Sequence, residues 1–253
     1  MSEVPQLQVI GLVGLPEVRP GDDLPSLIIE AARKQGARLQ DGDVLVVTQK
    51  VVSKAEGRLV DLRDVQPSAR AREVAKATGR DPRLVEVILR ESRRIVRQAG
   101  QVLITETKHG FVCANAGVDA SNVGGGDLVA LLPEDPDRSA EAIRRAIEER
   151  AGVSVAVIVS DTFGRPWREG HTNVAVGVAG MSPVRDYVGQ RDPFGFELRV
   201  STMAVADELA AAAEPVMGKL SRIPVVIVRG FAFEPGAGSA QELIRPPERD
   251  LFR

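Results

Sequence analysis

The sequence has very little cysteine and histidine, which restricts the kinds of site it can form. Among 253 residues the only cysteine is Cys113, which excludes an internal disulfide framework and any zinc site built from several cysteines. The two histidines, His109 and His171, are too few for a histidine-rich metal centre. Any metal ion bound here must therefore rely on carboxylate and hydroxyl oxygens, which are ligands of hard cations such as Mg²⁺ and Mn²⁺.

Long apolar runs and an excess of charge of one sign are also absent. No apolar run approaches the roughly 20 residues needed to span a bilayer, and the first residues lack the basic segment and apolar core of a signal peptide. The formal net charge is −2, so no global basic field attracts nucleic acid or a membrane surface. We therefore expect a cytoplasmic protein that acts on small molecules, with no nucleic acid and no membrane among its partners.

The common nucleotide-binding motifs are missing as well. There is no Gly-x-x-x-x-Gly-Lys-Ser/Thr, because Gly218-Lys219 comes after a predicted helix and is followed by Leu220. No Gly-x-Gly-x-x-Gly follows a strand, and the protein-kinase signatures are lacking. A nucleotide bound by this chain must be held by other means.

Short apolar strands and capped helices are mixed along the chain without a regular βαβ repeat. Clusters of branched apolar residues predict strands, and apolar residues at helical spacing predict helices. The predicted strands are residues 7–13, 43–49, 101–107, 110–114, 153–160, 173–179, 198–203 and 224–229, and the predicted helices are residues 24–35, 70–78, 82–94, 139–150 and 204–217. This pattern leaves α+β and irregular α/β classes both open.

The first of three polar segments, residues 48–57, follows a predicted buried strand. It carries Lys50, Ser53 and Lys54, whose side chains suit a polyphosphate. The alternative is a solvated connection between strand and loop, because charged runs usually face water.

The second polar segment, residues 116–123, is a predicted loop of small residues. Its Asp119 suits a metal ion, and the Asn122 amide suits a base or a phosphate. The alternative is an Asx turn, in which these side chains hydrogen-bond to the nearby backbone.

The third polar segment, residues 157–168, predicts a buried strand that delivers Asp161 and Thr162 at its end and then turns. Two arginines follow and flank the only tryptophan. Neighbouring oxygen ligands suit one divalent ion or two ions about 4 Å apart, which together polarise a phosphoryl group and activate a carboxylate. The alternative is that Asp161 caps a helix and pairs with an arginine at the surface.

Three further positions have competing interpretations. His171 could act as a base or as a hydrogen-bonded loop residue. Cys113 is predicted to be a small buried hydrophobic residue in a strand. Asp207 and Glu208 begin an alanine-rich helix, where acidic side chains stabilise the helix dipole.

In this order, the polar segments resemble the coenzyme F420-0:L-glutamate ligase family. The similarity extends from residue 7 to the end of the chain and includes several specific motifs. The matching segments are residues 14–24, 51–58, 116–123, 160–168, 191–195 and 205–210.

The resemblance implies a GTP-dependent enzyme that forms carbon–nitrogen bonds. Such ligases join L-glutamate to F420-0 and then add further glutamates through γ-linkages, by way of a metal-assisted acyl phosphate. It also implies an α+β fold of irregular mixed sheets with covering helices, in one domain of residues 1–253 without a C-terminal nitroreductase-like domain. The expected working unit is a homodimer with its sites near the subunit interface.

The family motifs assign roles to residues of this chain. Asp119 and Asp161 become the catalytic residues, and together with Thr162 they become the ligands of Mg²⁺ or Mn²⁺, with two ions per site and K⁺ as a further candidate ion. The implied contacts to GTP are Leu15, Pro16, Glu17, Val18, Gln49, Lys54, Asn122, Met217, Gly218 and Lys219.

Two of these positions depart from the family pattern. Gln49 stands where many relatives have serine or threonine. Lys219 stands where some archaeal relatives have a neutral amide near the second metal, and a cation cannot ligate a metal, so Lys219 is excluded from the metal set. Two alternatives to the ligase are a metal-dependent phosphoryl or nucleotidyl transferase acting on another small anionic metabolite, and a non-catalytic nucleotide-binding module.

Overall fold

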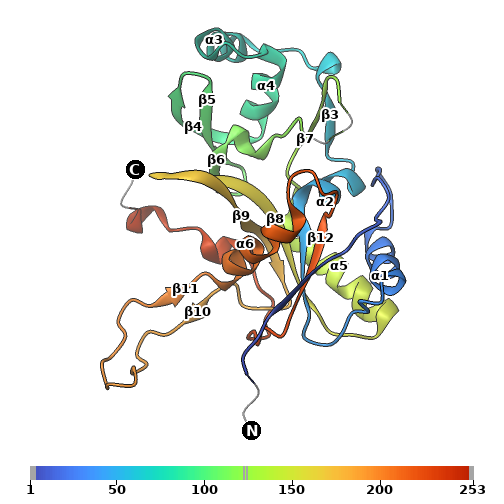
Figure 1. Ribbon diagram of the computed structural model, residues 1–253. Helices are drawn as coiled ribbons and strands as arrows, with labels where there is room; N and C mark the ends of the chain where they lie inside the picture. The colour runs from blue at the N-terminus through green and yellow to red at the C-terminus, as the bar shows by residue number, and fades with distance from the viewer. Residues whose placement is uncertain (1–3, 122, 124, 251–253) are drawn as a thin grey trace.

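A five-stranded mixed sheet forms the centre of the computed structural model, which describes residues 4–121, 123 and 125–250 (Figure 1). The strand order is β1-β12-β2-β8-β9. β2 and β8 run parallel, and the other neighbouring pairs run antiparallel. The strands are β1 (Gln8–Gly11), β2 (Val44–Thr48), β8 (Ala156–Arg165), β9 (Arg168–Ala179) and β12 (Val225–Arg229).

The three central strands are buried along most of their length because helices cover both faces of the sheet. β2, β12 and the first half of β8 consist almost entirely of buried valine, isoleucine, leucine and alanine. Helix α6 (Val205–Met217) packs on one side, and α1 (Leu24–Lys34) lies with α5 (Pro136–Ala151) on the other (Figure 1). The alanine-rich sequence of α6 allows this close approach to the sheet.

Gly177 shows how closely α5 meets β9. A Cβ atom added at Gly177 would lie 2.3 Å from the carbonyl oxygen of Pro136, at the start of α5. Only glycine is compatible with this contact, because real Cβ atoms essentially never come within 3.0 Å of other heavy atoms. The Asp137 side chain reinforces the junction by accepting a hydrogen bond from the Val178 backbone at 2.8 Å.

Residues between β2 and α5 build a second, smaller body, which lies at the top of Figure 1. It has separate hydrophobic clusters, one of which includes Leu62, Ile88 and Leu103. Its elements are β3 (Leu59–Asp61), η1 (Leu62–Asp64), α3 (Ala69–Thr78), α4 (Pro82–Arg90), β4 (Ser92–Ala99), β5 (Val102–Thr107), β6 (Val112–Ala114), η2 (Asn115–Gly117) and β7 (Leu128–Ala130). Helix α2 (Gln49–Ala55) leads into this body but packs against the central sheet, where its Val52 joins the main core. β3 pairs with β7, and β4, β5 and β6 form an antiparallel sheet.

A long arm at residues 185–203 extends from the body at the lower left of Figure 1. Its base is the two-stranded sheet of β10 (Arg185–Asp186) and β11 (Thr202–Met203). Several large apolar side chains are exposed on it, and Phe194 and Val200 are 96% and 90% exposed. The chain then passes through α6 and β12 to two short helical turns, η3 (Ala240–Leu243) and η4 (Pro247–Arg249).

The α+β class is confirmed, and most predicted elements are present with shifted ends. The prediction of a single domain stays a prediction. Within the described residues, no helix is both long enough and apolar enough to cross a membrane.

Four predictions about local structure were wrong. No helix was predicted within residues 48–57, but residues 49–55 form α2. The helix predicted over residues 82–94 ends at Arg90, because the following residues pair with β5 as strand β4. The strand predicted at residues 198–203 is reduced to two residues.

The fourth correction concerns the third polar segment. β8 does not end before Asp161 but continues to Arg165, because β9 pairs with this polar half and satisfies its backbone groups. The expected turn therefore comes after Arg165, and the helix-cap alternative for Asp161 is also wrong.

Candidate active site

A cavity of about 900 Å³ opens where β2 ends and α2 begins. Six separate chain segments line it, from the loop after β1 to the segment that connects α6 with β12. Ligands commonly bind at the carboxyl ends of parallel strands, because the chain leaves the sheet there and opens a crevice. The lining residues are 15–18, 48–51, 54, 119, 160–162, 171, 173, 214, 217–220 and 222–224.

α2 brings two lysines and a buried amide to the cavity. Gln49 is its first residue and is 1% exposed, and its Oε1 atom accepts a hydrogen bond from Ser53 Oγ at 2.8 Å. Lys54, at the end of α2, is buried and pairs with the exposed carboxylate of Glu17. Ser53, which was expected to meet a polyphosphate, instead holds Gln49.

Asp119 is held by a turn and by a lysine from another element. Its Oδ1 atom accepts a hydrogen bond from the Ser121 backbone at 2.7 Å, so the Asx turn considered as an alternative is present. Its Oδ2 atom lies 2.8 Å from Lys50 Nζ on α2. Burial raises the pKa of Asp119, but the hydrogen bonds from Lys50 and Ser121 outweigh it, so that the pKa is lower than usual. The turn therefore orients a charged carboxylate inside the cavity.

Asp161 and Thr162 lie side by side on β8 and both line the cavity. Burial raises the pKa of Asp161 to about 6, and the negative charge of Asp119 also raises it. Thr162 Oγ1 donates a hydrogen bond to Asn173 Oδ1 on β9 at 2.8 Å and accepts one from Lys219 Nζ at 2.7 Å. The two carboxylates therefore interact electrostatically, although 42 positions separate them in the chain (161 − 119).

An irregularity in the β8–β9 pairing explains why three consecutive residues reach one cavity. The register shifts between Val159 and Ser160, and Ser160, Asp161 and Thr162 all line the cavity. In a regular strand, successive side chains point to opposite faces. A bulge breaks this alternation and redirects side chains, and bulges are common next to functional sites.

The donor atoms fit a hard divalent cation. Two carboxylates and a hydroxyl supply oxygen ligands, and the mutual repulsion of Asp119 and Asp161 would be relieved by a positive ion between them. Within the described ranges, no group of three or more histidine, cysteine, aspartate or glutamate side chains is arranged to hold a metal. Thr162 and substrate oxygens would therefore have to complete the coordination.

Every predicted site residue that the structure describes lines this one cavity. Asn122 lies outside the described residues. The roles of these residues as ligands of metal or GTP stay predictions. The predicted residues that the cavity brings together are Leu15, Pro16, Glu17, Val18, Gln49, Lys54, Asp119, Asp161, Thr162, Met217, Gly218 and Lys219.

Sequence reasoning missed several lining residues. Asn173 lies opposite Thr162 in the β8–β9 register, so a correctly predicted hairpin would have found it. Glu214 and Arg222 flank the end of α6 and line the cavity, and no motif marked them. His171 also lines the cavity, but it lies on β9 rather than in the expected loop.

Two other expectations are confirmed by their surroundings. Cys113 is buried on β6, and burial together with the charge of Asp161 raises the pKa of its thiol to about 12. Asp207 and Glu208 lie in the first turn of α6. Asp207 Oδ1 also accepts a hydrogen bond from the Ala175 backbone at 2.8 Å, which ties the helix to β9.

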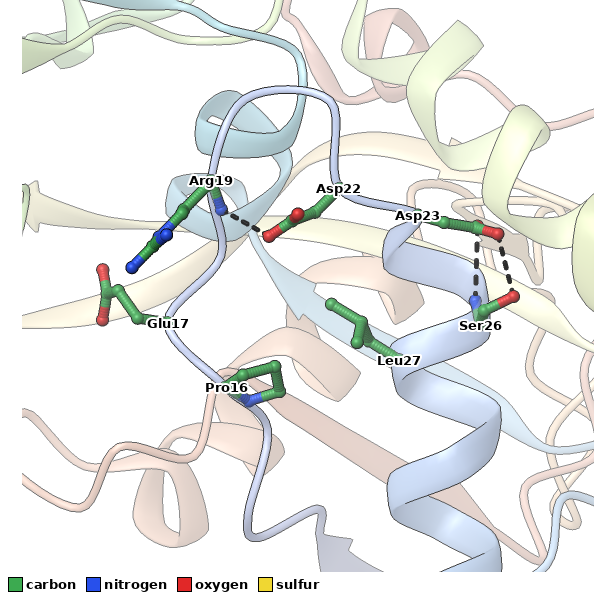
Figure 2. Close-up of a pocket in the computed structure, with 7 residues that line it drawn as sticks. All are labelled: Pro16, Glu17, Arg19, Asp22, Asp23, Ser26 and Leu27. Atoms are coloured by element: carbon green, nitrogen blue, oxygen red, sulfur yellow. Dashed lines mark hydrogen bonds between the residues drawn. The ribbon is translucent and has the colours of Figure 1, made fainter.

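A second cavity of about 440 Å³ lies against the loop that follows β1, near the start of α1 (Figure 2). Pro16 and Glu17 line both cavities, so this loop forms a wall between them. Asp23 caps α1 through a hydrogen bond with Ser26 and also pairs with Arg150 of α5. The caps and the ion pair fix the outer end of the wall.

Comparisons with known proteins identify the family of this chain. The family model described as "F420-0:Gamma-glutamyl ligase" matches residues 13–230, which is most of the chain. This chain belongs to that family. The match includes every described residue that was predicted for the site.

Curated relatives named "Coenzyme F420:L-glutamate ligase" match over nearly their whole length. The protein from Methanothermobacter thermautotrophicus is 50% identical over 98% of this chain and 99% of its own. The Methanopyrus kandleri protein is 48% identical and both chains are covered fully. The Methanocaldococcus jannaschii protein is 45% identical over 100% of this chain and 99% of its own. The resemblance seen in the motifs is therefore confirmed.

Proposed function

We propose that this chain ligates L-glutamate to coenzyme F420-0 and then adds further γ-linked glutamates, at the expense of GTP and with Mg²⁺ or Mn²⁺. The observation that carries the proposal is the cavity that Asp119 and Asp161 share with three lysines, Lys50 and Lys54 from α2 and Lys219 from the segment after α6. Family membership and the names of the relatives support the ligase activity. GTP and the metal rest on the resemblance and on the chemistry of the cavity.

Amide formation from a carboxylate needs activation, because a carboxylate is a poor acyl donor. Transfer of the terminal phosphoryl group of GTP to the acceptor carboxylate gives an acyl phosphate and GDP. The amine of L-glutamate then attacks the acyl carbon, releases phosphate and loses a proton. Bound at Asp119 and Asp161, a divalent cation would offset phosphate charge and help to align the carboxylate with the phosphoryl group.

The lysines of the cavity support this proposal. Lys50 pairs with Asp119, Lys54 with Glu17, and Lys219 with the Thr162 hydroxyl. Each ammonium group can exchange its present partner for an anionic oxygen of a bound substrate. Lysine is a common phosphate ligand because it presents a compact positive charge with three donors.

We also infer that the working unit is a homodimer. The exposed apolar side chains of the arm at residues 185–203 support this assembly, because large exposed apolar groups mark interaction surfaces. Light scattering coupled to size-exclusion chromatography tests it, and a mass of about 54 kDa, twice the 27.1 kDa chain, is expected. A monomeric mass at micromolar concentration would contradict the dimer.

Mass spectrometry of the reaction products tests the function most directly. The protein is incubated with F420-0, L-glutamate, Mn²⁺ and GTP, and the products should differ by increments of one glutamyl unit. GDP should be released only when F420-0 and L-glutamate are both present. GTP turnover with another acceptor and no glutamyl product would favour a phosphoryl transferase, and tight GTP binding without turnover would favour a binding module.

A further inference from the structure

Two buried polar side chains in the cavity have an atom without a hydrogen-bond partner. Across the described residues there are four such atoms, namely Gln49 Nε2, Thr105 Oγ1, His109 Nδ1 and Ser160 Oγ. Gln49 and Ser160 are each 1% exposed and both line the active-site cavity. Buried polar groups are nearly always paired, because an unpaired donor destabilises the fold. Two unpaired atoms in one cavity indicate a ligand that pairs with them.

The parallel pairing of β2 and β8 places these side chains next to each other. Thr48, the last residue of β2, is the register partner of Ser160 on β8, and Gln49 follows directly as the first residue of α2. The register shift between β8 and β9 begins at Ser160, so this residue joins Asp161 in lining the cavity. Both residues therefore line the cavity without any movement of the backbone.

Both free groups are hydrogen-bond donors without charge. Because Ser53 Oγ already donates to Gln49 Oε1 at 2.8 Å, the Nε2 protons are the hydrogen-bonding groups of Gln49 that remain without a partner. The Ser160 hydroxyl offers one proton. A ligand that pairs with both must present oxygen lone pairs, as a phosphoryl group does.

The charges around this pair favour a phosphoryl group. Asp119 is paired with Lys50, and Asp161 is suited to bind a cation. The lysines of the cavity and a cation bound there can therefore compensate the negative charge of a phosphate. Neutral donors can then fix the direction of a phosphoryl oxygen without adding charge to the site.

We propose that Ser160 and Gln49 form a neutral two-donor site for the phosphoryl group that passes from the nucleotide to the acceptor carboxylate, which makes Ser160 a further catalytic residue. The inference rests on the proposed function. In this step the bond from phosphorus to the leaving nucleoside diphosphate breaks, and a bond to the carboxylate oxygen forms. The two donors keep their protons and hold a non-bridging phosphoryl oxygen throughout the transfer.

The test compares Ser160→Ala with a control that removes the same kind of group elsewhere. Thr105 is fully buried on β5, and its Oγ1 atom is also unpaired, but it does not line the cavity. Thr105→Val removes that hydroxyl with little change of shape. For each variant, the melting temperature without ligands is measured together with kcat and KM for glutamate-dependent GDP release.

Ser160→Ala should separate activity from stability. Loss of one donor to a reacting oxyanion lowers kcat by about 100-fold, whereas the melting temperature without ligands should stay equal or rise, because an unpaired buried hydroxyl is gone. Thr105→Val should show the same stability behaviour with unchanged kinetics. A wild-type kcat for Ser160→Ala overturns the proposal, and so does a loss of activity that only follows a fall in melting temperature.

A binding measurement keeps this outcome distinct from a failure of the proposed function. If the wild-type protein forms no glutamyl product, the ligase assignment fails. The two-donor site is then tested separately, by measuring the affinity for a non-hydrolysable β,γ-imido analogue of GTP in the presence of Mn²⁺. Ser160→Ala should weaken that affinity at least about fivefold relative to wild type and Thr105→Val, in line with one lost hydrogen bond. Equal affinities for the three proteins overturn the two-donor site.

Discussion

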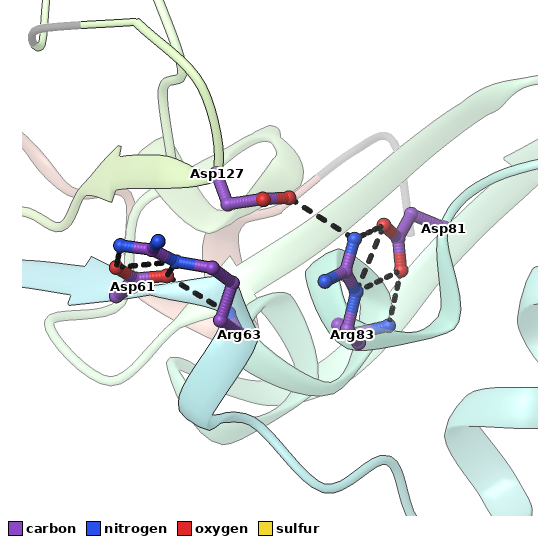
Figure 3. Close-up of polar contacts among 5 residues, drawn as sticks. All are labelled: Asp61, Arg63, Asp81, Arg83 and Asp127. Atoms are coloured by element: carbon purple, nitrogen blue, oxygen red, sulfur yellow. Dashed lines mark hydrogen bonds and ion pairs between the residues drawn. The ribbon is translucent and has the colours of Figure 1, made fainter.

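Two groups of charged contacts in this protein differ in how far along the chain they reach. On the surface of the smaller body, Asp61 pairs with Arg63 and Asp81 with Arg83, each only two positions apart (Figure 3). Arg83 is the exception in this group, because it also contacts Asp127, 44 positions away. In the cavity, the contact from Lys54 to Glu17 spans 37 positions and that from Lys219 to Thr162 spans 57.

The difference indicates what each group of contacts does. Local pairs such as Asp61–Arg63 join residues that are already close in the chain, so they do not depend on the rest of the fold. Because they face water, they contribute little to stability. The cavity contacts require the whole fold to be in place, and they bring lysines to oxygens that the family motifs assign to metal or GTP. We therefore expect substitutions in the two groups to have very different effects on catalysis.

The largest effect is expected for Asp161→Asn. The substitution keeps the size of the side chain but removes the charge that a divalent cation needs, so kcat should fall by about 10³-fold or more. The variant should still fold, because burying a neutral amide does not carry the cost of burying a charge, which raises the pKa of Asp161 to about 6. GDP release and circular dichroism measure the two properties.

The matched control for this change lies in the surface group. Asp127→Asn removes a partly exposed carboxylate that contacts Arg83 at 3.1 Å, and it should leave kcat within about twofold of wild type. Near-normal turnover and metal-dependent nucleotide binding in Asp161→Asn would refute the assigned role of this residue.

Lys54→Met should raise the KM for GTP by about 10- to 100-fold, since a hydrogen bond from a charged donor contributes about 1.5–3 kcal/mol. Lys54 is buried and lines the cavity. When its ammonium group is removed, water cannot easily take its place as a hydrogen-bond donor to the phosphate. Lys108→Met is the control, because Lys108 pairs with Glu91 at 3.3 Å outside the cavity. Equal KM values for the two variants would show that Lys54 does not meet the nucleotide.

Glu17→Gln should lower the KM for GTP by about two- to fivefold. Glu17 pairs with Lys54, so it would compete with an anionic nucleotide for this lysine. An ionised carboxylate has no proton to donate to a phosphate oxygen, so a contact between Glu17 and the nucleotide would have to come from the Glu17 backbone. Glu134→Gln provides the control, since Glu134 is similarly exposed and pairs with Arg58 away from the cavity. A KM that rises in Glu17→Gln alone would contradict this competition.

The smallest effect is expected for Arg63→Ala. The hydrogen bonds from Arg63 lower the pKa of Asp61 from 3.8 to about 2, so this pair supports the folded state above pH 4 and its contribution is lost as the pH falls toward 2. In Arg63→Ala, the pKa of the Asp61 carboxyl group should rise from about 2 toward 3.8 when followed by NMR, and the remaining backbone hydrogen bond of residue 63 and the charge of Arg83 keep it below that value. Ligase kinetics at neutral pH should not change, and a change would show that the two groups of contacts are coupled.

The sequence predicted the core of the fold because its signals there are local. β2 and β12 are runs of branched apolar residues, and α1 begins at an aspartate cap that the sequence shows directly. The site residues were identified through family motifs, and the fold brings those that it describes into one cavity.

The errors lie where tertiary contacts override local preference. β4 carries exposed arginines and continues a helical pattern, and only its pairing with β5 makes it a strand. α2 starts directly after β2 without a side-chain cap, so the sequence gives it no start signal. The free donors of Ser160 and Gln49 could not be predicted at all, because an unpaired buried atom is a property of the packed structure.

The central claim is that Asp119 and Asp161, from distant segments, hold one divalent cation beside the nucleotide. A crystal grown with Mn²⁺ and a guanine nucleotide tests it through the anomalous scattering of manganese. A peak is expected within about 2.0–2.6 Å of a carboxylate oxygen from each residue. A manganese peak held by other residues, with Asp119 and Asp161 apart and facing solvent, would contradict it.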